Sequence, residues 1–157
     1  MPLDPARISE VRSWFEKARE DLRAGEHQLA ANPPFLSDAA FHAQQAAEKT
    51  MKGFLAWHDH TFGKTHNLVE LGRACTSILP DLESVLRSSA PLTEYAWKFR
   101  YPGDPDEPTL GEVTEALRVA RDVYAAIAAR LPAEAIPQLV SQAVSPQRSS
   151  SQSRTRS

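Results

Sequence analysis

A short run of polar side chains between residues 42 and 52 carries charges that could hold an anion. His42, Gln45, Lys49 and Lys52 follow one another at steps of three, four and three residues, which places them on one strip of a helix. Lysine ammonium groups bind phosphate as point charges, and histidine can donate a hydrogen bond to the same group. The pattern therefore indicates a candidate anion-binding strip. On these residues alone we favour the more ordinary interpretation, a solvated helix face with a Glu48–Lys52 pair one turn apart.

A second cluster, residues 95–101, alternates aromatic and basic side chains. The alternating members are Trp97, Lys98, Phe99, Arg100 and Tyr101. Such a run can stack a nucleobase on an aromatic ring while a cation holds a phosphate. It is equally typical of the end of an amphipathic helix, in which Tyr95 and Phe99 pack inward and the cations complement the helix dipole. The pattern is consistent with both interpretations.

The other histidines and the single cysteine indicate structure more than catalysis. His58 and His60 lie two residues apart, where helical side chains diverge, and no third ligand follows at a metal-binding spacing. We therefore predict no metal site, and the chain has no cofactor motif such as a Gly-rich phosphate loop. His66 precedes a helix start, so we favour a local hydrogen bond to that helix. Cys75 lies on an apolar stripe and is predicted to be a core residue.

The composition is that of one globular domain with an acidic body. The chain has 157 residues, is 41% hydrophobic and carries a net charge of −2. From Pro132 onward there are three arginines and one acid, which leaves 19 acids against 15 bases in residues 1–131. An acidic body argues against general nucleic-acid binding but allows a small basic patch. With one cysteine, no long apolar run and no apolar core at the N-terminus, we expect a cytoplasmic protein without a membrane span.

Prolines divide the chain into stretches that each show helical periodicity. The predicted helices span residues 6–31, 37–58 and 67–78, a short segment between Pro80 and Pro91, a segment from Pro91 to Phe99, and residues 109–131. Their starts carry N-cap signals, which are Ser37, Asn67 with Glu70, and Thr109 with Glu112. No segment alternates with a period of two, so no strand is predicted.

The predicted fold class is all-α, an antiparallel up-down helical bundle of about five helices formed by residues 1–131. The helix at 37–58 carries an apolar arc beside a strip of small residues, Ala43, Ala46, Thr50 and Gly53. Because apolar or small residues surround most of this helix, we expect it to lie centrally in the bundle or in a dimer. Residues 132–157 are rich in Ser, Gln, Arg and Pro and are predicted to be a disordered tail.

Four segments of the chain resemble one known family. They are FHAQQAAEKTMKGFL at 41–55, THNLVEL at 65–71, LTEY at 92–95 and RYP at 100–102. In this order and spacing they are similar to the HEPN domain (higher eukaryotes and prokaryotes nucleotide-binding), and the resemblance covers residues 13–131. It implies an antiparallel helical bundle that forms a homodimer, in agreement with the fold predicted from periodicity.

The resemblance implies two different functions. Many members of the family are metal-independent ribonucleases, often toxins, that use an Arg followed four to six residues later by a His at the dimer cleft. Other small prokaryotic members are encoded beside a minimal nucleotidyltransferase and bind it, as an antitoxin or as the equivalent of a fused domain. Here Arg100 is followed by YPGDPDE, without a His, which weakens the ribonuclease interpretation. Acid–base catalysis near neutral pH would then need His42 or His66 in its place.

Our leading prediction is a nucleotide-binding or nucleotidyltransferase-associated module of a toxin–antitoxin-like pair. The predicted ligand-binding residues are Lys49, His66, Arg100 and Tyr101, with His42 and Lys52 as further candidates. They would hold a phosphate and a base in a cleft shared by two protomers. The alternatives are a toxin that cleaves RNA, with Arg100 as its electrostatic residue, and a dimeric helical scaffold that binds no ligand.

Overall fold

Five α-helices and three short 3₁₀ segments make up the part of the chain that the structure, a computed structural model, describes: residues 2–103 and 106–138. The α-helices are α1 (Pro5–Ala30), α2 (Leu36–Trp57), α3 (Leu68–Ile78), α4 (Glu83–Ser88) and α5 (Leu110–Ala128). The 3₁₀ segments are η1 (Pro80–Leu82), η2 (Ala90–Ala96) and η3 (Ala133–Ala135). The described residues contain no strand, so the predicted all-α bundle is confirmed.

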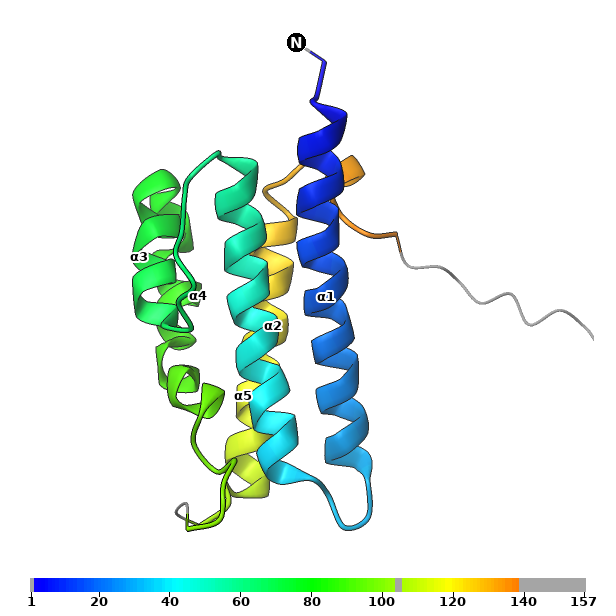
Figure 1. The fold of residues 1–157 in the computed structure, drawn as a ribbon, viewed down its shortest axis with the longest axis vertical. Helices are drawn as coiled ribbons and strands as arrows, with labels where there is room; N and C mark the ends of the chain where they lie inside the picture. The colour runs from blue at the N-terminus through cyan, green and yellow to red at the C-terminus, as the bar shows by residue number, and fades with distance from the viewer. Residues whose placement is uncertain (1, 104–105, 139–157) are drawn as a thin grey trace, which may run out of the picture.

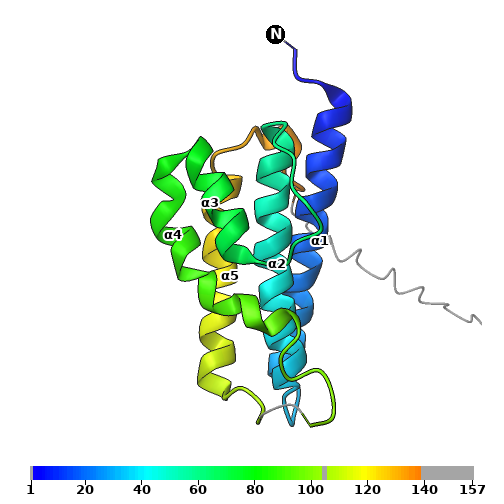
Figure 2. The same cartoon turned by 60° about the vertical axis from the view of Figure 1, so that its left-hand side comes forward.

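The helix α2 lies at the centre of the bundle, as its apolar and small residues predicted. It packs against α1, α3, α5 and η2. Figures 1 and 2 show α1 and α2 side by side and antiparallel, with α5 on another side of α2 and running in the same direction as α2. The segment 58–67 runs back along α2 before α3 begins, so α2 and α3 point the same way and strict alternation ends there (Figure 1). A segment of this length spans roughly 33 Å when extended, which is enough for the return.

Two glycines allow the long helices to approach one another closely. A Cβ atom on Gly53 of α2 would meet Phe15 Cε2 of α1 at 2.8 Å. A Cβ atom on Gly25 of α1 would meet Leu117 Cδ2 of α5 at 2.7 Å and the Ala39 carbonyl oxygen of α2 at 3.4 Å. Because these interiors are close-packed, a larger residue at either position would force its neighbours to move.

The N-caps of α3 and α5 match the sequence prediction. The Asn67 side chain accepts hydrogen bonds from the backbone N–H groups of Val69 at 2.9 Å and Glu70 at 3.4 Å. Thr109 and Glu112 form the reciprocal capping box at the start of α5. These side chains satisfy N–H groups that have no partner within their own helix, so both helices start where local sequence directs them.

The predicted Ser37 cap and the predicted helix ending at Phe99 are wrong. The helix α2 begins one residue earlier, at Leu36, and the Ser37 hydroxyl donates instead to the Glu107 carboxylate at 3.3 Å. The 3₁₀ segment η2 ends at Ala96, and Phe99 has a left-handed φ of 68°. An α-helix cannot continue through that backbone conformation, so residues 97–101 form a turn.

More of the segment that follows α5 packs on the bundle than we predicted. Ala135 is fully buried, and Arg12 and Arg19 of α1 donate hydrogen bonds to backbone carbonyls of this segment. The predicted tail therefore begins too early, because Ala135 and Ile136 cover part of the core. The rest of that tail, residues 139–157, lies outside the described residues.

Candidate functional site

The polar strip of α2 is not the solvated face that its spacing suggested. Lys52 and Glu48 are only 7% and 3% exposed, and His42 and Lys49 each expose 24% of their side chains. Their partners come from α1 and from the segment 58–67, which flank the strip. The strip is organised around two buried carboxylates, Asp21 and Glu48.

Glu48 gathers four polar partners around one carboxylate. Its Oε1 accepts from Lys52 Nζ at 2.8 Å, and its Oε2 accepts from Gln44 Nε2 at 3.0 Å and Gln45 Nε2 at 3.3 Å. His66 Nδ1 lies 2.9 Å from the same Oε2. Burial alone would raise the pKa of Glu48, but the hydrogen bonds from Lys52, Gln44 and His66 outweigh it and hold this pKa below its ordinary value. Glu48 is therefore ionised at neutral pH.

Lys52 is enclosed on its other side by two aromatic rings. Its Nζ lies 5.9 Å from the Trp14 ring centroid and 5.8 Å from that of Phe62, and these two rings meet edge to face at 5.9 Å. Trp14 belongs to α1 and Phe62 to the segment 58–67, so one ammonium group joins both to α2. Lys52 thus stabilises the fold, and its charge is already matched by Glu48.

Asp21 of α1 forms the centre of the second cluster. Its Oδ1 lies 2.8 Å from His42 Nδ1, and its Oδ2 accepts from Lys49 Nζ at 2.6 Å. Lys49 is thus paired with an acid of the neighbouring helix. Asp21 was not among the predicted site residues, although a signal was present. It lies three residues after Ala18 and four before Gly25, so it is an acid on an otherwise apolar, buried stripe.

Arg100 has the opposite environment. It is exposed, and its guanidinium carbon lies 3.8 Å from the centroid of the Phe41 ring in α2. No carboxylate of the described residues pairs with it. Eight residues separate Phe41 from Lys49, or about 12 Å along the helix axis, so Arg100 and Lys49 do not form one compact cluster. Sequence analysis also missed Phe41, because no local pattern connects it to a turn so far along the chain.

The aromatic side chains next to Arg100 lie at the surface. Trp97 is 56% exposed and Tyr101 is 71% exposed. Tyr95 packs against the core, and the Phe99 ring lies 6.1 Å from the Tyr95 ring. The turn thus separates its aromatic residues into an inward pair and an outward pair, and the outward pair flanks the exposed guanidinium along the chain. Exposed rings beside a cation are the arrangement in which a base can stack while a phosphate is held.

His66 does not make the local hydrogen bond to α3 that we predicted, because its ring is directed to Glu48. An ionised carboxylate can only accept a hydrogen bond, so this contact requires a proton on Nδ1. The His66 backbone carbonyl accepts from Gln44 Nε2 at 3.2 Å, which holds the main chain as well. The His66 side chain is 62% exposed. A buried carboxylate therefore orients an imidazole that is open to solvent.

Cys75 is a buried core residue, as predicted, and burial raises the pKa of its thiol to about 12. Such a thiol is unreactive at neutral pH. Within residues 2–103 and 106–138, no three His, Cys, Asp or Glu side chains are grouped as metal ligands would be. The same part of the chain contains no helix that combines the length and the apolar character needed to cross a bilayer.

Two comparisons with known proteins found matches. A family model described as HEPN domain matches residues 11–131, which is most of the described bundle. The crystal structure of TT1696 from Thermus thermophilus is similar to this chain with a TM-score of 0.61 and 29% sequence identity, over 77% of this chain and 98% of TT1696. A comparison with curated proteins found no match.

Proposed function

The chain belongs to the HEPN domain family, and on that premise we propose that it is a nucleotide-binding module with its site around Arg100. We further propose that it acts as one half of a two-gene, toxin–antitoxin-like pair with a minimal nucleotidyltransferase. Of the predicted ligand-binding residues, Arg100, His66 and Tyr101 are exposed, and His66 remains exposed although its Nδ1 contacts Glu48. Lys49 and Lys52 are less exposed and are paired with acids. We therefore assign ligand binding to the first three, and to Lys49, Lys52 and His42 the role of holding α1, α2 and the segment 58–67 together.

The environment of Arg100 carries this proposal. The Arg100 guanidinium carbon lies 3.8 Å from the centroid of the Phe41 ring, and no acid of the described residues pairs with the N–H groups at its edge. Those edge donors match the oxygen atoms of a phosphate in pairs. The ring also restricts the side chain, so less conformational entropy is lost when the phosphate binds. An exposed arginine that lies over an aromatic ring, with no acidic partner among the described residues, is thus available to an anionic ligand.

The distance between Arg100 and His66 limits the size of the ligand. Arg100 lies over Phe41, whereas His66 contacts Glu48, seven residues and about 10 Å farther along α2. One phosphate group cannot span that distance. A nucleotide is long enough to span it, with its phosphate on Arg100 and its sugar or base directed along α2. The exposed rings of Trp97 and Tyr101 provide surfaces on which a base can stack.

A thermal titration with AMP and ATP tests nucleotide binding. A ligand at about 100 times its dissociation constant stabilises the folded state by about 2.7 kcal/mol, which raises the melting temperature by roughly 5–10 °C in a domain of this size. We expect this rise in the wild type and its loss in Arg100→Gln. Arg23→Gln, a change at an exposed arginine of α1, is the matched control and keeps the rise. A melting temperature that millimolar nucleotide leaves unchanged contradicts the proposal.

Co-expression with the neighbouring gene product tests the proposed pair. We expect a minimal nucleotidyltransferase encoded beside this chain to co-purify with it, and we expect the chain alone to elute as a homodimer in size-exclusion chromatography. Elution as a monomer would contradict a site shared by two protomers. A failure to co-purify would contradict the pair but leave nucleotide binding to be judged by the thermal titration.

Metal-independent cleavage of RNA is the second candidate function, and the Glu48–His66 pair favours it. The family pattern has a histidine after Arg100 that this chain lacks, but an imidazole oriented by a carboxylate can supply the same chemistry. His66 Nε2 would accept the proton of a 2′-hydroxyl while the 2′-oxygen attacks phosphorus, and the bond from phosphorus to the 5′-oxygen would break as that oxygen takes a proton from water. Because one phosphate cannot reach both His66 and Arg100 of the same protomer, Arg100 of the partner subunit would stabilise the charge on the phosphorane. The products would be a 2′,3′-cyclic phosphate and a 5′-hydroxyl.

Incubation with a structured RNA in the presence of EDTA tests this second candidate. Cleavage that EDTA leaves unchanged, and that Arg100→Ala and His66→Gln both abolish, would support it. Absence of cleavage, or cleavage by the His66→Gln protein at the wild-type rate, would exclude Glu48 and His66 as its acid–base pair.

A further inference from the structure

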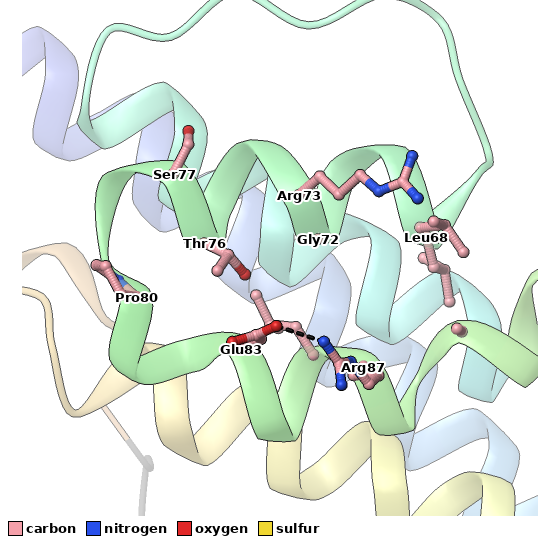
Figure 3. A pocket seen from close by; sticks show the side chains of 11 residues that line it. Leu68, Gly72, Arg73, Thr76, Ser77, Pro80, Glu83 and Arg87 are labelled. Atoms are coloured by element: carbon pink, nitrogen blue, oxygen red, sulfur yellow. Dashed lines mark hydrogen bonds and ion pairs between the residues drawn. The ribbon is translucent and has the colours of Figure 1, made fainter.

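A groove between α3 and α4 is separate from the polar face of α2. Its volume is about 420 Å³, within the range of sites for small molecules. Figure 3 looks into this groove, with α3 along one side and the shorter α4 along the other. No residue of the Arg100 site lines it. The nucleotide proposal therefore leaves this groove without a function.

One residue on the α3 side of the groove, Gly72, has no side chain. Gly72 of α3 faces α4, and a Cβ atom added there would lie 3.7 Å from Leu86 Cβ, at ordinary contact distance. The lining includes Leu68, Leu86 and Pro80. Val69, which also lines the groove, is 39% exposed. This lining suits a ligand with an aliphatic part.

The charged residues of the groove favour a single negative charge. Arg87 is paired with Glu83 one turn earlier, whereas Arg73 is exposed and no acid of the described residues pairs with it. Two arginines and one glutamate sum to a charge of +1. In Figure 3 the Arg87 guanidinium points into the space between the helices, and Arg73 extends along α3 toward the Leu68 end. A carboxylate at the Leu68 end would meet the guanidinium donors of Arg73, and one negative charge would balance the net charge of the lining.

We propose that this groove binds a small amphipathic monoanion, an aliphatic chain that ends in a carboxylate. The carboxylate pairs with Arg73 at the Leu68 end of the groove, while Arg87 stays paired with Glu83. The chain covers Gly72 and Leu86 and points toward Pro80. The proposal is independent of the nucleotide site, because the two regions share no residue.

A titration of the ¹⁵N-labelled full chain with sodium octanoate tests the proposal. Octanol and octylammonium have the same alkyl chain with no charge and with a positive charge, and inorganic phosphate has the charge without the chain. We expect octanoate to shift the amide signals of Leu68, Gly72 and Thr76 in a saturable manner. We expect octanol to bind about tenfold more weakly, and octylammonium and phosphate to leave these signals in place. Equal binding of octanol and octanoate would overturn the proposal.

Two substitutions test separately the contribution of the Arg73 charge and that of the groove surface at Gly72. Arg73→Gln is expected to weaken octanoate binding about tenfold, and Arg23→Gln on α1 is the control that leaves it unchanged. Gly72→Leu places a side chain in the groove and is expected to abolish octanoate binding. If the Gly72→Leu protein does not fold, the Arg73→Gln result alone tests the proposal. Octanoate binding that Arg73→Gln leaves unchanged would overturn the proposal. So would groove signals that shift when the protein alone is concentrated, because a second copy would then be the occupant.

Discussion

The cations at two places along α2, its middle and its start, have opposite environments. Along the middle of α2, Lys49 and Lys52 each contact a carboxylate that is at most 7% exposed. Near the start of α2, Arg100 lies over an aromatic ring, and no carboxylate of the described residues contacts it. All three cations were predicted to bind a ligand. Within the part of the chain that the structure describes, only the third has no acidic partner.

The difference follows from what surrounds each charge. A lysine that is buried between helices must be paired, because an isolated ammonium in a low-dielectric interior is very costly. An arginine on a surface turn keeps its hydration and needs no acid. The middle of α2 therefore holds the bundle together, and the Arg100 end is the part that can exchange water for a ligand. This contrast predicts large stability effects in the first region and small ones in the second.

The largest expected effect is that of Glu48→Gln. The substitution leaves Lys52, which is 7% exposed, without its counter-charge. Breaking a buried pair in this way costs about 3–5 kcal/mol. Urea unfolding followed by circular dichroism measures the loss, with Glu115→Gln on the exposed face of α5 as the control, expected within about 0.5 kcal/mol of wild type. A loss below about 1 kcal/mol would show that the pair is hydrated in solution.

Asp21→Asn is expected to cost less, about 1–2 kcal/mol. Its partners Lys49 and His42 each keep 24% of their side chains exposed, so the lysine can extend its ammonium to water when the acid is lost. The same urea measurement applies. A cost equal to that of Glu48→Gln would mean that the two clusters are equally buried in solution, which would contradict the distinction drawn between them.

The pH dependence of stability offers a second test of the Glu48 cluster. The pKa of the Glu48 carboxyl group is lowered from 4.5 in the folded protein. As the pH falls, Glu48 therefore takes up its proton in the unfolded chain before it does so in the folded protein. The stabilisation is fully present above pH 4.5 and is lost as the pH falls through the lower, folded pKa. Urea midpoints measured from neutral to acid pH should therefore fall more steeply for wild type than for Glu48→Gln. Parallel curves would contradict the lowered pKa.

The smallest expected effect on stability is that of Arg100→Gln, about 0.5 kcal/mol or less. An exposed contact between a cation and a ring contributes little, and no buried group loses a partner. Urea unfolding of this variant should nearly overlay that of wild type. A loss of 2 kcal/mol, well above the roughly 1 kcal/mol of an exposed cation–ring contact, would place Arg100 among the structural cations and remove the contrast between the two regions.

Local signals in the sequence were enough to predict most of the fold. The apolar periodicity of α1, α2 and α5 and the caps Asn67 and Thr109 act within a few residues, so one stretch of sequence contains them entirely. The short η2 segment and the left-handed Phe99 were not predictable from periodicity, because a stripe of apolar residues does not distinguish an α-helix from a 3₁₀ turn. The packed segment after α5 was missed because its few apolar residues, such as Ala135, are buried only by contact with the bundle.

The candidate site was less predictable, because its decisive contacts join distant parts of the chain. The spacing of His42, Lys49 and Lys52 correctly placed them near one another on α2, but nothing local showed that Asp21 of α1 would reach two of them. His66 was assigned to the nearest helix, whereas the return of the segment 58–67 directs its ring to Glu48. Sequence patterns located the polar residues, and tertiary packing decided which of them remain exposed.

Isothermal titration calorimetry of AMP with two variants tests the central claim most directly. Arg100→Gln removes the cation that no acid of the described residues contacts, and Lys49→Gln removes one that is paired with Asp21. We predict that Arg100→Gln weakens AMP binding by about tenfold or more, as expected for the loss of charge-assisted hydrogen bonds, and that Lys49→Gln changes it by less than about twofold. The reverse order, with Lys49→Gln abolishing binding and Arg100→Gln leaving it intact, would place the ligand on the α2 strip and contradict the account.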